Sequence, residues 1–204
     1  KVGVISTING DANIGFYKEL AAADISADDI PVVAFSVGEE ELSGLDTTNL
    51  TGHLAAWNYF QSADTEANNA WVSAWKAKMG EARVTNDPME AHYIGFNMWV
   101  NAVTDAGTTD VDAVRAAMYG QKFPNLTGGT AVMLPNHHLA KPVLIGEIMA
   151  DGQFDILSQT AEVKGDAWTD YLAESAVLMS DWKDLGCGMY NTQTQTCVQI
   201  KSNY

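Results

Sequence analysis

Two consecutive segments of this chain share one pattern: a short apolar run ends in a small polar loop, and a helical pattern follows. The pattern spans residues 2–20 and returns at residues 30–42. Repeated strand–loop–helix units predict a parallel sheet in an α/β fold, and ligands of such sheets lie at the carboxyl ends of the strands. We therefore expect the two loops to form one wall of a small-molecule binding cleft. The loop residues are Asn9, Gly10 and Asp11 in the first loop and Ser36, Val37, Gly38 and Glu39 in the second.

The composition and charge of the chain exclude some classes of partner. The chain has 204 residues, of which 47% are hydrophobic, and this is enough for a sizeable core. Lys and Arg number 11 against 26 Asp and Glu, so the net charge is −15. A nucleic-acid-binding protein typically carries a basic patch, so this balance argues against nucleic acid and against an anionic membrane surface as partners. The sequence also contains no apolar run of the ~20 residues that span a bilayer.

Helices and strands are expected along most of the chain. Asp11 or Asn13 is expected to cap the first helix, Asp87 to cap a helix that continues through Pro88, and Thr109 to cap another. Three successive glutamates at 39–41 suit the first turn of a helix, because its amino end carries partial positive charge. The expected helices are 14–23, 65–79, 87–106, 109–119 and around 168–178, and the expected strands are 2–5, 31–36, 53–60, 130–134, 142–149 and 154–158, with a hairpin turn at Asp151-Gly152.

The two cysteines, Cys187 and Cys197, lie near the carboxyl terminus with nine residues between them. Two thiols cannot complete a four-ligand structural zinc site, and no base stands close in sequence to activate a catalytic thiol. We favour a disulfide that closes a short terminal hairpin, and two inert thiols are the alternative. A disulfide would place the protein in an oxidising compartment.

Sequence motifs for phosphate binding, zinc proteolysis or a serine nucleophile are absent, so we expect no catalytic residues, no metal and no cofactor. Ser36 follows a strand but lacks the small residues of a nucleophile elbow. His137 and His138 are adjacent and would point to opposite faces of an extended segment, which favours packed loop histidines over a metal site. Trp57 and Tyr59 are candidates for lining a cleft, although core packing is the favoured interpretation for both.

Six segments, in order along the chain, carry a resemblance to a known family: TINGDANIGFYKEL, IPVVAFSVGEEEL, GHLAAWNYF, TNDPMEAHYIGFNMW, PNLTGGTAVMLPNHHLAKPVLIGEI and DGQFDIL. Together they resemble the urea-binding, short-chain-amide branch of the type I periplasmic solute-binding proteins of ABC transporters. The family fold has two α/β lobes joined by crossovers, with the ligand in the cleft between the lobes. The resemblance covers only the C-terminal half of such a receptor, so we expect an N-terminal half to precede Lys1.

The resemblance implies an assignment of the chain to lobes and partners. Residues 1–52 would belong to the second lobe, 53–60 to a hinge crossover, 61–123 to the first lobe and 124–204 to the return into the second lobe. The partners implied are a small ligand, the ABC permease subunits and the missing N-terminal half. The location implied is the periplasm or another extracytoplasmic space, and no enzymatic activity is expected.

The same resemblance implies that both strand-end loops contact the ligand. Urea offers four N–H donors and one carbonyl acceptor, so Asp11 or Glu39 would accept its N–H groups and backbone N–H groups at a helix start would donate to its carbonyl. An amino-acid ligand would use the same acids against its ammonium group. A branched-chain amino-acid receptor and a cytoplasmic amide-sensing regulator of the same fold are therefore the alternatives.

Overall fold

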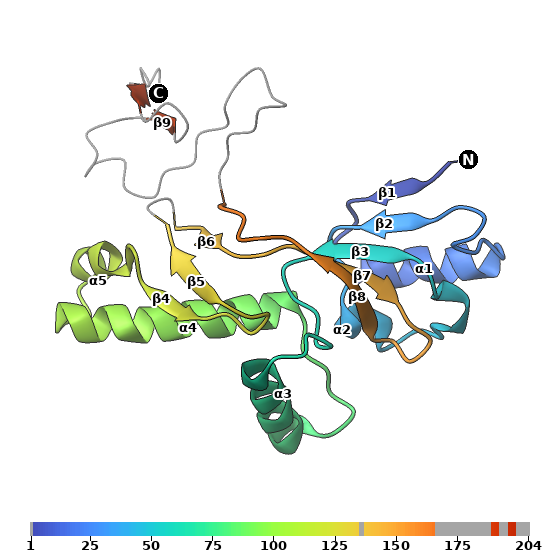
Figure 1. Ribbon diagram of the computed structural model, residues 1–204, viewed down its shortest axis with the longest axis horizontal. Coiled ribbons are helices and arrows are strands. Elements are labelled where there is room, and N and C mark those ends of the chain that lie inside the picture. Colours follow the sequence, from blue (N-terminus) through green and yellow to red (C-terminus); the bar gives the residue numbers. More distant parts are fainter. Residues whose placement is uncertain (1, 135–136, 166–188, 192–195, 199–204) are drawn as a thin grey trace. The chain divides into compact units, whose positions relative to one another are not determined.

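The computed structural model describes residues 2–134, 137–165, 189–191 and 196–198 (Figure 1). Its contacts divide the chain into two compact units. Unit 1 consists of Lys1–Gly95, Pro124–Thr130 and Pro142–Glu162, and unit 2 consists of Phe96–Phe123, Ala131–Lys141 and Val163–Tyr204. Among the described residues, no helix is long and apolar enough to cross a membrane.

A five-stranded mixed sheet forms the centre of unit 1 (Figure 1). The strand order is β1-β2-β3-β7-β8, in which β1, β2 and β3 are parallel and β7 and β8 are antiparallel to their neighbours. The two predicted strand–loop–helix units thus pair in parallel as expected. The strands are β1 (Val4–Ser6), β2 (Val32–Ala34), β3 (Leu54–Trp57), β7 (Leu144–Ile148) and β8 (Phe154–Gln159).

Helices α1 (Ala12–Ala22) and α2 (Glu39–Leu42) pack against one face of this sheet and close the core of unit 1. Tyr17 and Leu20 of α1 and Leu42 of α2 are buried against the inward-facing strand residues. Those strand residues alternate with partly exposed ones, as the period-two geometry of a strand requires. The buried strand residues are Val32, Ala34, Ala55, Leu144, Ile148 and Phe154.

The β7–β8 hairpin packs against the core through a close aromatic contact. The rings of Phe60 and Phe154 stack with centroids 4.2 Å apart, and a Cβ added at Gly146 would lie only 2.9 Å from the Phe60 ring and 3.0 Å from the Phe154 ring. Only a glycine leaves room for this stack. The predicted Asp151-Gly152 turn is confirmed, with Gly152 at φ 76° and the Met149 N–H donating to the Gln153 carbonyl across the turn.

The remaining elements agree with the predicted ones in type, and their starts differ by a residue or two. The predicted helices are observed as α3 (Glu66–Met79), α4 (Asp87–Ala106) and α5 (Val111–Met118), and the predicted strand at 130–134 is observed as β5 (Thr130–Met133). The elements that the sequence analysis does not predict are η1 (Thr48–Leu50), β4 (Lys122–Pro124) and β6 (Leu139–Ala140), which are too short to show a periodic pattern.

Two predicted helix caps were wrong by one residue. The Asn86 side chain accepts the Met89 N–H at 3.2 Å, so Asn86 caps α4 and Asp87 is already helical. The Asp110 carboxylate accepts the Ala113 N–H at 3.0 Å and takes the place predicted for Thr109. In both cases the sequence offers two capping side chains in a row, and residue type alone does not decide which of the two positions is the cap.

The terminal hairpin is confirmed in part. Strands β9 (Met189–Asn191) and β10 (Thr196–Val198) pair antiparallel, with Cys197 opposite Tyr190. Cys187 and the helix expected around 168–178 lie outside the described residues, so the disulfide stays a prediction.

Candidate functional site

The first strand-end loop, residues 7–11, follows β1 and opens into α1. Asn9, Gly10 and Asp11 are all exposed. Gly10 has φ 61°, in the left-handed region that favours glycine. Asp11 stands at the N-cap position of α1 in a helical conformation, and its side chain makes no capping hydrogen bond. The carboxylate that was predicted either to cap the helix or to meet a ligand is therefore not used as a cap.

The second strand-end loop, residues 35–39, follows β2 and differs in its surroundings. Ser36 is half-buried, whereas Val37, Gly38 and Glu39 are buried. The Gly38 N–H donates to the Glu41 carboxylate at 2.9 Å, so Glu41 closes the start of α2. A Cβ added at Gly38 would meet the Trp57 indole at 3.4 Å, which shows that the end of β3 covers this loop.

Glu39 lies inside unit 1 with 1% of its surface exposed. Its Oε1 accepts the Gln61 N–H at 2.6 Å, and its Oε2 has no hydrogen-bond partner. Burial, with a smaller contribution from the like charge of Glu41, raises the pKa of Glu39 to about 8. Through the Gln61 bond, this buried side chain links α2 to the segment after β3.

Gln61 connects Glu39 to a wider buried network. Its side-chain oxygen accepts the Thr85 N–H at 2.8 Å, and its side-chain nitrogen donates to Gln153 at 2.9 Å. Tyr59, one of the two aromatic residues proposed to line a cleft, is fully buried, with its hydroxyl 2.8 Å from both Asn68 and Thr85. Tyr59 therefore belongs to the interior, as the favoured interpretation had it.

The sequence predicted Asn13 only as a possible cap of the first helix and did not point to Asn58, but both side chains bond to backbone carbonyls far along the chain. Asn13 is completely buried, and its amide nitrogen contacts the carbonyl oxygens of Ile8 and Ser36, one in each loop. Asn58, just after β3, donates its backbone N–H to Asp87 at 3.0 Å and its side-chain N–H to the Pro142 carbonyl at 2.7 Å. A polar residue inside an otherwise apolar helix pattern was the available signal for Asn13.

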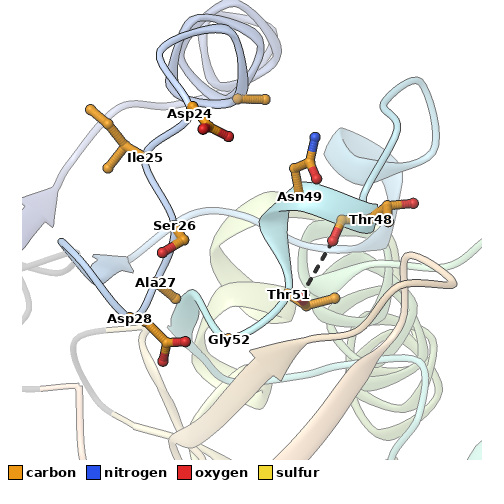
Figure 2. Close-up of a pocket in the computed structure, with 10 residues that line it drawn as sticks. Asp24, Ile25, Ser26, Ala27, Asp28, Thr48, Asn49, Thr51 and Gly52 are labelled. Carbon is orange, nitrogen blue, oxygen red and sulfur yellow. Dashed lines mark hydrogen bonds between the residues drawn. The ribbon is translucent and has the colours of Figure 1, made fainter.

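Two hollows lie on unit 1, and both are away from the first loop. One of about 350 Å³ is bounded by Glu39, the end of α2 and the β7–β8 turn, and its polar lining includes Asp46, Thr47 and Asp151. The other, of about 240 Å³, is drawn in Figure 2 and is formed by the segments that precede β2 and β3. It therefore lies at the amino ends of the parallel strands, opposite the edge where ligands of such sheets bind. Its labelled lining residues are Asp24, Ile25, Ser26, Ala27, Asp28, Thr48, Asn49, Thr51 and Gly52.

Metal-ligating clusters are not found among the described residues. His137 lies against the Tyr119 ring, with centroids 5.0 Å apart, and burial lowers the pKa of its imidazole. His53 accepts the Val32 N–H at its Nδ1 at 3.1 Å in the buried interior. These contacts give both side chains packing roles.

A comparison of the sequence with known protein families identifies the family of this chain. The profile of the periplasmic binding protein domain matches residues 1–174. The chain belongs to this family. In this domain the first loop stands exposed at the carboxyl edge of the parallel strands.

Solved structures agree with this family in fold. The chain resembles an amino acid ABC transporter substrate-binding protein from Pseudomonas fluorescens Pf-5 with a TM-score of 0.64 and 19% identity, over 82% of this chain and 45% of that one. An R. palustris solute-binding protein in complex with 4-hydroxybenzoate gives 0.67 and 18%, over 78% and 45%. A leucine-binding protein from Thermotoga maritima gives 0.61 and 16%, over 78% and 44%. The domain therefore has the type I periplasmic-binding-protein fold, and it spans less than half the length of these chains.

A curated relative carries an enzyme's name. The protein called limonene hydroxylase from Geobacillus stearothermophilus is 34% identical over 106 residues, which are 52% of this chain and 19% of that protein. The match covers a small part of that protein, so the activity in its name remains a statement about that protein.

Proposed function

We propose that this periplasmic binding protein domain belongs to an extracytoplasmic receptor that binds urea or a short-chain amide and delivers it to the permease of an ABC transporter. The observation that carries the proposal is the exposed first loop, whose Asp11 carboxylate is not used to cap α1. The receptor performs no chemistry on its ligand. Lobe closure around the ligand would supply the signal that the permease recognises.

The chemistry of the first loop suits a donor-rich neutral ligand. The Asp11 carboxylate and the Asn9 side chain offer acceptors for amide N–H groups at an exposed edge. The amino end of α1 carries partial positive charge and suits a ligand carbonyl oxygen. A site that pairs every polar group of its ligand discriminates strongly against ligands that lack one.

A branched-chain amino acid is the second candidate, because a leucine-binding protein shares the fold. Its ammonium group would be met by the same Asp11 carboxylate. Its carboxylate, like that of a benzoate, requires a cation or a set of N–H donors. Neither loop contains Lys, Arg or His, so such a ligand would depend on donors from elsewhere in the receptor.

Calorimetric titration of the full-length protein with urea, acetamide, leucine and 4-hydroxybenzoate tests the proposal. We expect heat of binding from urea or acetamide and none from the two carboxylate ligands. Tight binding of leucine without any response to urea would replace the amide assignment with an amino-acid one.

The proposed extracytoplasmic location has a separate test in the two cysteines. Because a disulfide persists in oxidising compartments, we expect the native protein to gain two mass units on reduction. Cys197 lies in β10, while Cys187 is outside the described residues. Free thiols in the protein isolated from its natural source would favour the cytoplasmic regulator instead.

A further inference from the structure

We propose that Asn13 and Ser36 are positioning residues that fasten the two strand-end loops to each other and so hold the ligand-facing side of the first loop in place. The expected effect on ligand binding rests on the proposed function. The bonds that fasten one loop to the other are contacts within unit 1 and do not depend on it.

Asn13 supplies one donor to each loop. The residue is in the first turn of α1 and its side chain is completely buried. The amide nitrogen donates to the carbonyl oxygen of Ile8 at 3.1 Å and to that of Ser36 at 3.0 Å. A primary amide carries two N–H groups on one nitrogen, so a single side chain satisfies both carbonyls. Aspartate and leucine have nearly the same shape and lack these donors.

Ser36 adds a direct bond from the second loop to the first. Its hydroxyl donates to the Ile8 carbonyl at 2.6 Å, so this oxygen accepts from both Asn13 and Ser36. The backbone adds a further link where β2 ends, since the Phe35 N–H donates to the Ser6 carbonyl at 3.2 Å. The first loop is thus attached to its neighbour by two side chains as well as by the sheet.

The orphaned oxygen of Asn13 shows what this position requires. Its Oδ1 is buried and has no hydrogen-bond partner, an arrangement that costs free energy of folding. An apolar side chain would avoid that cost but would leave the carbonyls of Ile8 and Ser36 without this donor. The two donated bonds are therefore the reason for an asparagine at this point of the helix.

The fastening also decides which atoms of the first loop can meet a ligand. The Ile8 and Ser36 carbonyls are committed to Asn13, and the Gly10 and Asp11 carbonyls accept the N–H groups of Asn13 and Ile14. The exposed Asp11 carboxylate, which makes no capping bond, then remains as an acceptor for amide N–H groups of a ligand.

The experiment compares Ser36→Ala with Thr47→Val in the full-length protein. Thr47 offers a matched control, because its hydroxyl donates to the Ala150 carbonyl at the same 2.6 Å and the residue is 5% exposed, beside the hollow bounded by α2. Each variant deletes one hydroxyl-to-carbonyl bond. Asn13→Leu, which removes two bonds, is measured as well if it folds.

Two measurements are made on each variant: amide hydrogen exchange of residues 7–11, and the dissociation constant for urea by calorimetry. Ser36→Ala should raise the exchange rates of the first loop and weaken urea binding by about three- to tenfold, whereas Thr47→Val should change neither. Unchanged exchange in the first loop of Ser36→Ala overturns the fastening, whatever the ligand. Faster exchange with unchanged urea affinity overturns the link to binding. Absence of urea binding in the unmodified protein counts against the proposed ligand, and the exchange result then decides the fastening alone.

Discussion

The two strand-end loops of unit 1 differ in their exposure to solvent, although one sequence pattern predicts both. In the first loop, Asn9 and Asp11 are exposed, and in the second, Val37 and Glu39 are buried. The difference follows from the positions of their strands. β1 has one neighbour in the described sheet, while β2 lies between β1 and β3, and the end of β3 places Trp57 over the second loop. A neighbouring strand on each side of β2 thus accompanies the burial of the second loop, and the first loop follows a strand with one neighbour.

The contrast assigns the loops different tasks. The first loop offers an uncommitted carboxylate at the carboxyl edge, which suits ligand recognition. The polar groups of the second loop form hydrogen bonds within the protein. The Glu39 carboxyl accepts the Gln61 N–H, and the Gly38 N–H donates to Glu41. The predicted contact of Glu39 with a ligand stays a prediction, and the burial of its side chain and its bond to Gln61 favour a role in holding the core together.

The largest expected effect is on stability, from Leu42→Ala in the helix that follows the second loop. Leu42 is 1% exposed, so its truncation should lower the free energy of unfolding by about 2–5 kcal/mol. Asp11→Ala, in the exposed loop, should change it by less than ~0.5 kcal/mol. Unfolding in guanidinium chloride measures both, and it avoids urea, the proposed ligand. Equal destabilisation by the two changes would remove the contrast between the loops.

The buried acid of the second loop predicts a pH dependence. Because the pKa of Glu39 is raised from 4.5 to about 8 on folding, its contribution to stability is complete below pH 4.5 and is lost as pH rises through 8. The free energy of unfolding should fall by up to roughly 4 kcal/mol over that range, and Glu39→Gln should remove most of the fall.

The adjacent Glu40 is the control for this experiment. It pairs with Arg83 at 3.6 Å with both side chains well exposed, so Glu40→Gln should leave the pH profile of stability as it is. Calorimetric melting between pH 4.5 and 8 measures all three proteins. Parallel stability profiles for the unmodified protein and Glu39→Gln would contradict a raised pKa of Glu39.

A smaller effect distinguishes the glycines of the two loops. Gly10 has φ 61°, so Gly10→Ala should cost about 1–2 kcal/mol of stability and Gly10→Asn less, because asparagine tolerates this conformation. Gly38 has φ −135°, and an added Cβ would make ordinary contact with Trp57 at 3.4 Å. Gly38→Ala should therefore cost under ~1 kcal/mol. Denaturant unfolding measures both variants. A larger loss of stability in Gly38→Ala than in Gly10→Ala would show that close packing, and not backbone conformation, limits these positions.

Local patterns in the sequence predicted most of the fold. The apolar runs, the Pro88 helix start and the Asp151-Gly152 turn are signals contained within a few residues, and each was confirmed in type. What local patterns could not supply is the identity of spatial neighbours. The burial of Glu39 depends on Gln61, 22 residues later, and the fastening by Asn13 depends on Ser36, 23 residues later. Asn86 caps α4, because the Asp87 carboxylate accepts the N–H of Asn58 instead.

The central claim is that the first loop recognises the ligand through Asp11. Calorimetric titration of urea into the full-length protein, Asp11→Ala and Asp28→Ala tests it most directly, since Asp28 is also an exposed acid and lies at the opposite edge of the same sheet. We predict that Asp11→Ala weakens binding by ~1–3 kcal/mol, about five- to 150-fold, and that Asp28→Ala binds urea like the unmodified protein. Equal urea affinity in all three proteins would contradict the claim.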